Sequence, residues 1–184
     1  MKIFAIYLRL VLTSKPDWFD DIRNKYSSTS ILHITLIQPR YVKENEIQDL
    51  KDRVSSVLSK GEFNDKKLIF TNTELWWDEK DSEYLLMSFI KENKSVLNLQ
   101  GNLMEALKDF NNYCDESMKE YELNFKPHLT IANRISLDAK EEIAKLISEN
   151  FVLDGSITDL VLPIVKDRSV EESEDPNNWI VFDI

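Results

Sequence analysis

The sequence predicts a mixed α and β fold that forms a single unit across residues 1–184. Apolar runs rich in large and β-branched side chains predict strands, and segments with apolar residues at helical spacing predict amphipathic helices. Only three glycines and five prolines occur, so no flexible linker separates independent domains. A strand, a turn and an acidic-started helix also occur twice in the same order, which suggests two related halves.

The first third of the chain predicts two strands and two helices. The continuous apolar run near 2–12 is typical of a central strand covered on both faces, and 31–37 forms a second strand that Pro39 ends. The segment 14–26 has a hydroxyl cap, an early proline and an acidic first turn, which predict a short helix. Apolar residues recur at helical spacing over 44–58 and predict a second, amphipathic helix.

The middle of the chain predicts a meander followed by a long helix. Strand-like runs occupy 68–73, 74–77 and 84–90. Turn residues between these runs predict reversals of the chain at Asn72 and at 78–82. A single apolar face over about 95–113 predicts a long helix, even with Gly101 inside it.

The last third predicts a strand, a helix and two final strands. The strand at 127–132 precedes an acidic-started helix over about 136–150. Two further strands are expected near 156–165 and 178–184. The acidic run 171–176 between them is expected to be a solvated surface loop without a metal, because blocks of like charge repel and prefer water.

Charge and cysteine content restrict the class of partner and the compartment. The net charge of -10 repels a long polyanion, because binding along a duplex depends on neutralising phosphates with Lys and Arg. A small nucleotide or a short RNA end is compatible with this charge, since a local cluster of donors can hold one phosphate. Cys114 is the only cysteine, which excludes an intramolecular disulfide and a thiolate metal site and indicates the cytoplasm.

The N-terminal apolar run is not typical of a targeting segment. Arg9 interrupts it and no small-residue cleavage site follows, so a buried strand is the better interpretation. No stretch approaches the roughly 20 apolar residues that a membrane span needs. No heptad run stands out either, and we expect a monomer that does not bind membranes.

Both histidines of the chain lie in the same short pattern. His33 and His128 are each followed by an apolar residue, a threonine and a second apolar residue. Because side chains alternate along a strand, His33 and Thr35 point to one face, and His128 and Thr130 point to one face of their own strand. Each strand therefore presents an imidazole and a hydroxyl side by side from a rigid support.

This combination of side chains suits phosphodiester chemistry. Cleavage needs a base for the attacking water or hydroxyl and an acid for the leaving oxygen, and imidazole can serve as either near neutral pH. Threonine hydroxyls can donate hydrogen bonds to the non-bridging oxygens and stabilise the charge that develops there. The predicted catalytic residues are His33, Thr35, His128 and Thr130, and no metal or other cofactor is expected.

Two other interpretations of the histidines are open. A single histidine on a strand is usually a satisfied structural residue without a chemical task, although the repeated pattern argues against this. A shared zinc site is the second alternative, but zinc usually takes three or four protein ligands and the chain has no third histidine or nearby cysteine.

At these motifs the sequence resembles the two-histidine (2H) phosphoesterase superfamily, which includes 2'-5' RNA ligase-like proteins and 2',3'-cyclic nucleotide phosphodiesterases. The hallmark of that superfamily is a pair of H-x-[ST]-apolar motifs about half a chain apart, here 33–36 and 128–131, and Pro127 is also family-like. The resemblance covers nearly the whole chain. It implies a bilobal α+β fold with two antiparallel sheets, pseudo-twofold symmetry, helices outside and an active-site groove between the lobes.

The resemblance maps the two histidines and two threonines onto a catalytic tetrad. The activities that it implies are hydrolysis of 2',3'-cyclic phosphates, cleavage of 2'-5' linkages, trimming of RNA ends or ligation. We therefore expect a metal-independent phosphodiesterase. A non-catalytic nucleotide-binding or interaction module on the same fold is the alternative, because a pocket can persist where catalysis is lost.

Substrate contacts cannot be transferred from the resemblance. Residues 38–41 stand where many relatives have a short glycine-containing turn. Guanidinium and ammonium groups suit phosphate, and aromatic faces suit bases. The candidate phosphate donors are Arg40, Lys126 and Arg134, and the candidate base-stacking residues are Tyr41, Trp76 and Trp77. For the two tryptophans, packing in the core or in a half-buried strand pair is the alternative.

Overall fold

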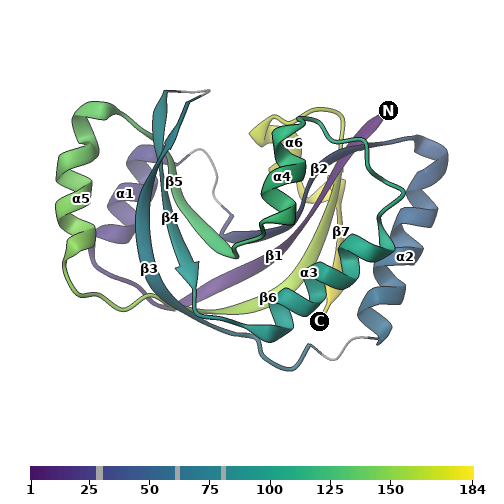
Figure 1. The fold of residues 1–184 in the computed structure, drawn as a ribbon, viewed down its shortest axis with the longest axis horizontal. Helices are drawn as coiled ribbons and strands as arrows, with labels where there is room; N and C mark the ends of the chain where they lie inside the picture. The colour runs from purple at the N-terminus through teal and green to yellow at the C-terminus, as the bar shows by residue number, and fades with distance from the viewer. Residues whose placement is uncertain (28–30, 61–62, 80–81) are drawn as a thin grey trace.

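The computed structural model describes residues 1–27, 31–60, 63–79 and 82–184, and its described strands form one antiparallel sheet (Figure 1). The strand order is β2-β1-β6-β3-β4-β5, and β7 pairs with β6. The strands are β1 (Lys2–Ser14), β2 (His33–Val42), β3 (Lys67–Asp78), β4 (Glu83–Ile90), β5 (His128–Ile135), β6 (Asp154–Val165) and β7 (Trp179–Asp183).

The helices lie outside the sheet, except for α4 and α6 near its open side (Figure 1). They are α1 (Trp18–Tyr26), α2 (Ile47–Lys60), α3 (Lys94–Ala106), α4 (Ser117–Leu123), α5 (Lys140–Ser148) and α6 (Val170–Glu174). Helix α1 packs against β5 and α5 against β3, whereas α2 and α3 pack together and α3 contacts β2. None of the described helices is long and apolar enough to cross a membrane.

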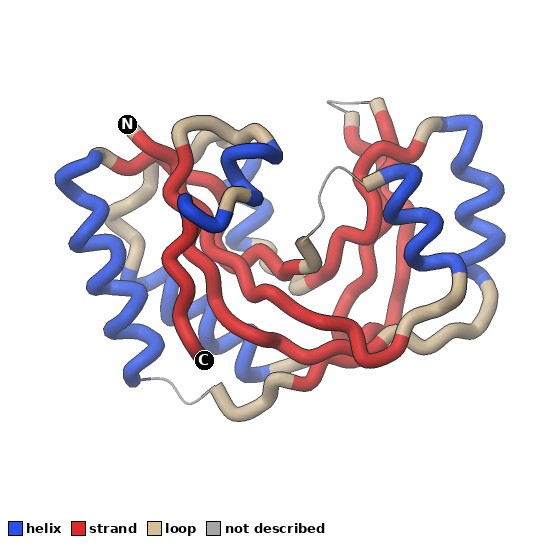
Figure 2. The backbone as a smooth tube through the Cα atoms, turned by 180° about the vertical axis from the view of Figure 1, so that it is seen from behind, coloured by secondary structure: helices blue, strands red, loops and turns tan. Residues whose placement is uncertain are grey.

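The sheet bends into two lobes that face each other, as the tube in Figure 2 shows from behind. The first lobe contains β2, β1, β6 and β7, and the second contains β3, β4 and β5. Strand β3 joins them, because its start at 67–69 pairs with β6 while the rest pairs with β4. The end strands β2 and β5 contact each other, which closes the bend. The predicted bilobal α+β fold is confirmed, with the two antiparallel sheets continuous through β3.

Alternation along the strands separates the core from the groove between the lobes. Ile34 and Leu36 are buried on the helix-facing side of β2, and Leu129 and Ile131 are buried on the corresponding side of β5. The residues that alternate with them, including both histidines, are only partly buried and face the groove. Burying several such apolar side chains, each worth about 1.5–3 kcal/mol, fixes which face of each strand turns inward.

Several element boundaries differ from the sequence prediction. The two strands expected at 68–73 and 74–77 are one strand, because a bulge between Phe70 and Asn72 absorbs the irregularity without a turn. The helix expected from residue 14 begins at Trp18, since β1 continues to Ser14. The turn expected at 78–82 lies partly outside the described residues.

The long helix expected over 95–113 is the largest boundary error. Helix α3 ends at Ala106. Nη1 of Arg40 donates to the carbonyls of Leu107 and Phe110 at 3.2 and 2.8 Å, so these carbonyls are satisfied without a further helical turn. The Phe110 ring packs edge-on against Phe4 in the core, at 6.0 Å between centroids. Tertiary contacts therefore end α3 early.

Candidate active site

The two histidines begin the two strands that meet across the groove. His33 is the first residue of β2 and His128 the first residue of β5. Nδ1 of His33 lies 3.2 Å from the carbonyl oxygen of Ile31, and Nδ1 of His128 lies 2.8 Å from that of Lys126. A carbonyl oxygen only accepts, so this hydrogen-bond network assigns the proton of each neutral ring to Nδ1. Nε2 then carries the lone pair in both rings.

His33 lines a pocket between β1, β2 and α6. Its ring is 4.9 Å from that of Tyr7, between centroids. Both residues line this pocket of about 280 Å³ together with Thr35, Arg168 and Glu174. Burial lowers the pKa of His33, and the nearby His128 and Arg23 lower it further, whereas the Ile31 carbonyl and the Glu174 charge oppose this. The neutral imidazole is therefore favoured.

His128 lies in a more aromatic environment. The hydroxyl of Tyr121 is 3.1 Å from Nε2 of His128, and the Phe89 ring is 5.7 Å from the imidazole ring. Trp76, Phe89, Tyr121 and Lys126 line a second pocket of about 280 Å³ beside this histidine. Burial lowers the pKa of His128 and raises that of Tyr121 to about 12. The Tyr121 hydroxyl thus stays protonated at neutral pH and can donate to Nε2.

The lowered pKa of both imidazoles predicts that the fold loses stability at acidic pH. Histidine in an unfolded chain titrates near about pH 6.5, so protons bind the unfolded chain more readily than this folded one. The stability that the neutral rings contribute to the fold is fully present above about pH 6.5. It is lost as the pH falls from there through the pKa values of the folded protein. We expect the urea-derived free energy of unfolding to fall between about pH 7 and pH 5, less steeply in His33→Gln. Identical slopes in both proteins would exclude this role of His33.

The two threonines occupy the expected positions beside the histidines. Thr35 pairs with Tyr7 across β1 and β2 and lines the pocket of His33. Thr130 pairs with Met87 across β5 and β4, on the same face as His128. The structure therefore places a partly buried hydroxyl two residues beyond each imidazole.

Helix α4 reaches the groove because a buried glutamate anchors it. Glu122 forms an ion pair with Arg40, accepts from the Gln38 backbone N–H at 2.8 Å, and accepts from the Tyr113 hydroxyl at 2.5 Å. Its side chain is almost fully buried, as is that of Arg40. The anchored helix carries Tyr121 to His128, and α4 also contacts β2.

The predicted substrate contacts divide into two groups. Lys126 and Trp76 line a pocket with Phe89 and Tyr121, whose rings contact His128, so the structure places them near that histidine. Trp77 lies on the opposite face of β3, where its ring packs against Tyr84 at 4.9 Å. Trp76, and not Trp77, therefore faces the groove.

Three other predicted contacts lie away from the histidines. Arg40 is 1% exposed and its guanidinium bonds Glu122 and two backbone carbonyls, so its selection as a phosphate donor is wrong: it is a core residue. Tyr41 lines a separate pocket with Lys43 and Arg53 near the end of β2. Arg134 is exposed near the far end of β5.

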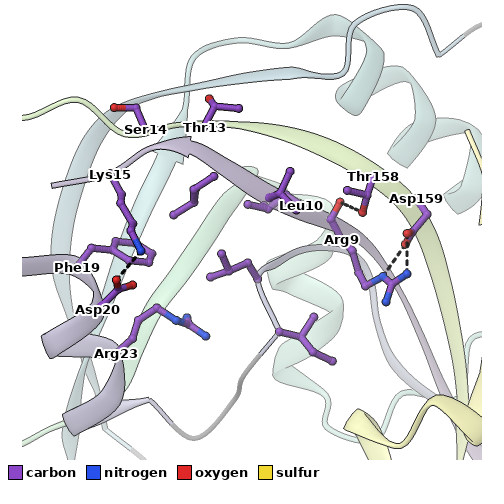
Figure 3. Close-up of a pocket in the computed structure, with 14 residues that line it drawn as sticks. Arg9, Leu10, Thr13, Ser14, Lys15, Phe19, Asp20, Arg23, Thr158 and Asp159 are labelled. Atoms are coloured by element: carbon purple, nitrogen blue, oxygen red, sulfur yellow. Dashed lines mark hydrogen bonds and ion pairs between the residues drawn. The ribbon is translucent and has the colours of Figure 1, made fainter. Parts of the chain in front are cut away.

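A larger pocket of about 810 Å³ is lined mainly by residues of β1 and α1 (Figure 3). Arg23 from α1 lines it and donates to the Ile131 carbonyl at 3.2 Å, which ties α1 to β5. Arg9 lines it too and holds Asp159 through two hydrogen bonds of 2.7 and 2.6 Å. Arg9 and Arg23 are therefore held in place by contacts with β6 and β5.

Sequence reasoning missed four residues around the histidines, namely Tyr7, Arg23, Tyr121 and Glu174. Each comes from a different element, and its position in the sequence does not show that it lies near a histidine in the fold. Tyr7 had one available signal in the sequence: it is a tyrosine inside a largely apolar strand. In the structure, no group among the described residues bonds its buried hydroxyl. Burial also raises the pKa of Tyr7.

The described residues contain no group of three or more His, Cys, Asp and Glu side chains placed to hold a metal ion. The acidic segment near α6 is no exception. The side chains that line the pockets in and beside the groove include imidazole, hydroxyl, aromatic, cationic and carboxylate groups.

Comparison with known proteins identifies the family. The model of the 2'-5' RNA ligase superfamily matches residues 14–165, which include both histidine motifs. The chain belongs to this superfamily. The superfamily, that of the two-histidine phosphoesterases, processes phosphodiesters, so membership indicates an enzyme that acts on phosphodiester bonds.

Solved structures support the same fold. Usb1 from Kluyveromyces marxianus superposes with a TM-score of 0.56 at 8% identity, covering 99% of this chain and 98% of that one, and a structure of Usb1 with uridine monophosphate gives the same values. A crystal structure described as a phosphoesterase gives a TM-score of 0.51 at 11% identity, covering 100% and 95%. No curated protein matches the sequence.

Proposed function

We propose that this member of the superfamily is a metal-independent phosphodiesterase that acts on 2',3'-cyclic phosphates or on 2'-5'-linked nucleotides and RNA ends. The observation that carries the proposal is the matched pair of imidazoles from β2 and β5. Each ring turns Nδ1 to a backbone carbonyl, which leaves Nε2 as the atom that exchanges protons with a substrate. The contact between β2 and β5, and the effect of His128 on the pKa of His33, support a site in which one phosphate reaches both rings.

The proposed reaction requires one neutral and one protonated imidazole. One neutral imidazole accepts through Nε2 the proton of the attacking water or hydroxyl, whose oxygen forms the new bond to phosphorus. The other imidazole enters protonated and gives its Nε2 proton to the leaving oxygen as the old bond breaks. The hydroxyls of Thr35 and Thr130 donate to the non-bridging oxygens as negative charge develops on them.

The pocket beside His128 favours a nucleotide as substrate. Trp76 and Phe89 contact each other at 5.7 Å between centroids, and both line this pocket with Tyr121. Aromatic faces stack on any base, and the ammonium of Lys126 suits a phosphate. A solved structure of Usb1, which shares this fold, is described as containing uridine monophosphate. Because the net charge of the protein is -10, the proposed partner is a small nucleotide or a short RNA end. We also propose that the protein is a cytoplasmic monomer.

Trp76 and Trp77 provide a matched test of base stacking. Stacking on one aromatic side chain is worth about 1–3 kcal/mol, so Trp76→Ala should lower kcat/KM for a 2',3'-cyclic nucleotide by about 5- to 150-fold. Cleavage of a bis-aryl phosphate, which has no base, should change much less. Trp77→Ala removes the neighbouring indole from the opposite face and should leave both rates near wild type. Equal losses in the two variants would show that Trp76 does not bind a base.

The proposed activity is tested by turnover of a small panel in the presence of EDTA. The panel contains 2',3'-cyclic nucleotides, a 2'-5'-linked dinucleotide and a bis-aryl phosphate, and product analysis identifies the bond that breaks. We expect cleavage of at least one nucleotide and no loss of rate with EDTA. Saturable nucleotide binding without turnover at any pH would instead identify a non-catalytic binding module on this fold.

A further inference from the structure

The acidic segment near α6 contains two kinds of carboxylate. Its sequence predicts a solvated loop, but the structure forms a short helix there, in which Glu171 is exposed and the carboxylates that follow are partly buried. Glu174, at the end of α6, is partly buried and lines the same pocket as His33, Thr35 and Tyr7. Helix α6 lies beside the open side of the groove (Figure 1), which explains how a residue so late in the chain reaches β2. One carboxylate of the acidic run therefore belongs to the candidate site.

Glu174 is linked to His33 through one residue of the chain. Its Oε1 accepts the backbone N–H of Ile31 at 3.3 Å. The carbonyl oxygen of the same residue lies 3.2 Å from Nδ1 of His33. The carboxylate thus fixes the backbone of Ile31, and Ile31 in turn fixes the tautomer and the orientation of the imidazole. Outer partners of this kind orient functional histidines in many proteins.

Glu174 acts on the pKa of His33 in the opposite direction to the other charged groups around that ring. His128 from β5 and Arg23 from α1 lower the pKa of His33, and Glu174 from α6 raises it. From β1, Arg9 pairs with His33 in the strand register but holds Asp159 with its guanidinium, and Tyr7 contributes a neutral ring. The pKa of His128 depends instead on burial and on the Lys126 carbonyl. Among the described residues, a nearby carboxylate therefore raises the pKa of His33, whereas none acts on His128.

We propose that Glu174 is the positioning residue of His33, holding Ile31 so that the imidazole keeps Nε2 toward the groove and compensating the charge of the ring when it takes a proton. An opposite charge nearby favours the protonated imidazole, so Glu174 makes His33 a better proton acceptor than burial alone allows. The effect of Glu174 on catalysis through His33 rests on the proposed phosphodiesterase activity. The titration of His33 does not depend on it.

The experiment uses the fact that the chain has only two histidines. NMR of the imidazole Cε1–H groups gives one signal for each histidine, which His128→Asn assigns, and titration from about pH 4 to 8 gives both midpoints. Glu174→Gln should shift the His33 midpoint to lower pH and leave the His128 midpoint unchanged. Glu171→Gln removes the same charge from the same helix at an exposed position and should move neither. With a cleavable substrate, the limb of the pH–rate profile that belongs to His33 should move by the same amount in Glu174→Gln.

Three results would overturn the proposal: an unchanged His33 midpoint in Glu174→Gln, an equal shift of both histidines, or an equal shift in Glu171→Gln. If Glu174→Gln does not fold, the ring ¹⁵N shifts of the wild type still decide, since the proposal requires the Nδ1–H tautomer of neutral His33. An Nε2–H tautomer would contradict it. A shifted midpoint in a protein without turnover would retain the pairing and reject the phosphodiesterase activity.

Discussion

Replacing His33 or His128 by alanine should lower kcat/KM by about 10²- to 10⁴-fold on any substrate that the wild type cleaves, because each variant removes one positioned proton donor or acceptor. The double variant should lose little more than either single variant. An acid and a base that act on the same transition state form a unit, so their effects do not add. Steady-state rates measured with EDTA give all three values.

The histidine variants need a check that the loss is chemical. Both side chains are partly buried at the starts of strands, so urea unfolding of each variant establishes that the fold is intact. Rates within a few-fold of wild type in either folded variant would remove that histidine from the mechanism. Additive losses in the double variant would show that the rings act independently and not as a pair.

Removing the charge of Glu122 should produce the largest loss of stability. Glu122→Gln keeps the size of the side chain but leaves the guanidinium of Arg40 buried without its carboxylate. Breaking a buried ion pair from one side costs about 3–5 kcal/mol, because the remaining charge is uncompensated. The free energy of unfolding from urea titration at neutral pH measures this loss.

Two further variants separate the ion pair from other effects on α4. Glu120→Gln changes an exposed carboxylate of the same helix and should stay within about 0.5 kcal/mol of wild type. The double variant Arg40→Met/Glu122→Leu removes both charges and should recover much of the lost stability, since buried ion pairs are often no better than apolar replacements. A Glu122→Gln protein as stable as wild type would mean that Arg40 is compensated elsewhere.

The histidine motifs and the strands that carry them could be predicted because they depend on local rules. Alternation along a strand places His33 beside Thr35 and buries Ile34, whatever the rest of the chain does. The apolar periodicity of 44–58 likewise predicts α2 within a few residues. These features need no knowledge of which strands pair.

The surroundings of the histidines could not be predicted because they depend on pairings between distant segments. Arg40 has the sequence character of a phosphate donor, and only its pairing with Glu122 of α4 makes it a core residue. The choice between Trp76 and Trp77 depends on the position of one bulge in β3, since a shift by one residue exchanges the two faces. Glu174 reaches His33 because β6 returns to the first lobe, which no local pattern encodes.

The most direct test of the account is the pH dependence of kcat/KM for the best substrate of the panel, measured for the wild type and each histidine variant. Two imidazoles that act as acid and base predict a bell-shaped profile in the wild type. Each variant should lose the limb of its missing ring and keep the other. A wild-type profile that is flat across the titration range of both rings, or variants that keep both limbs, would contradict two-histidine catalysis.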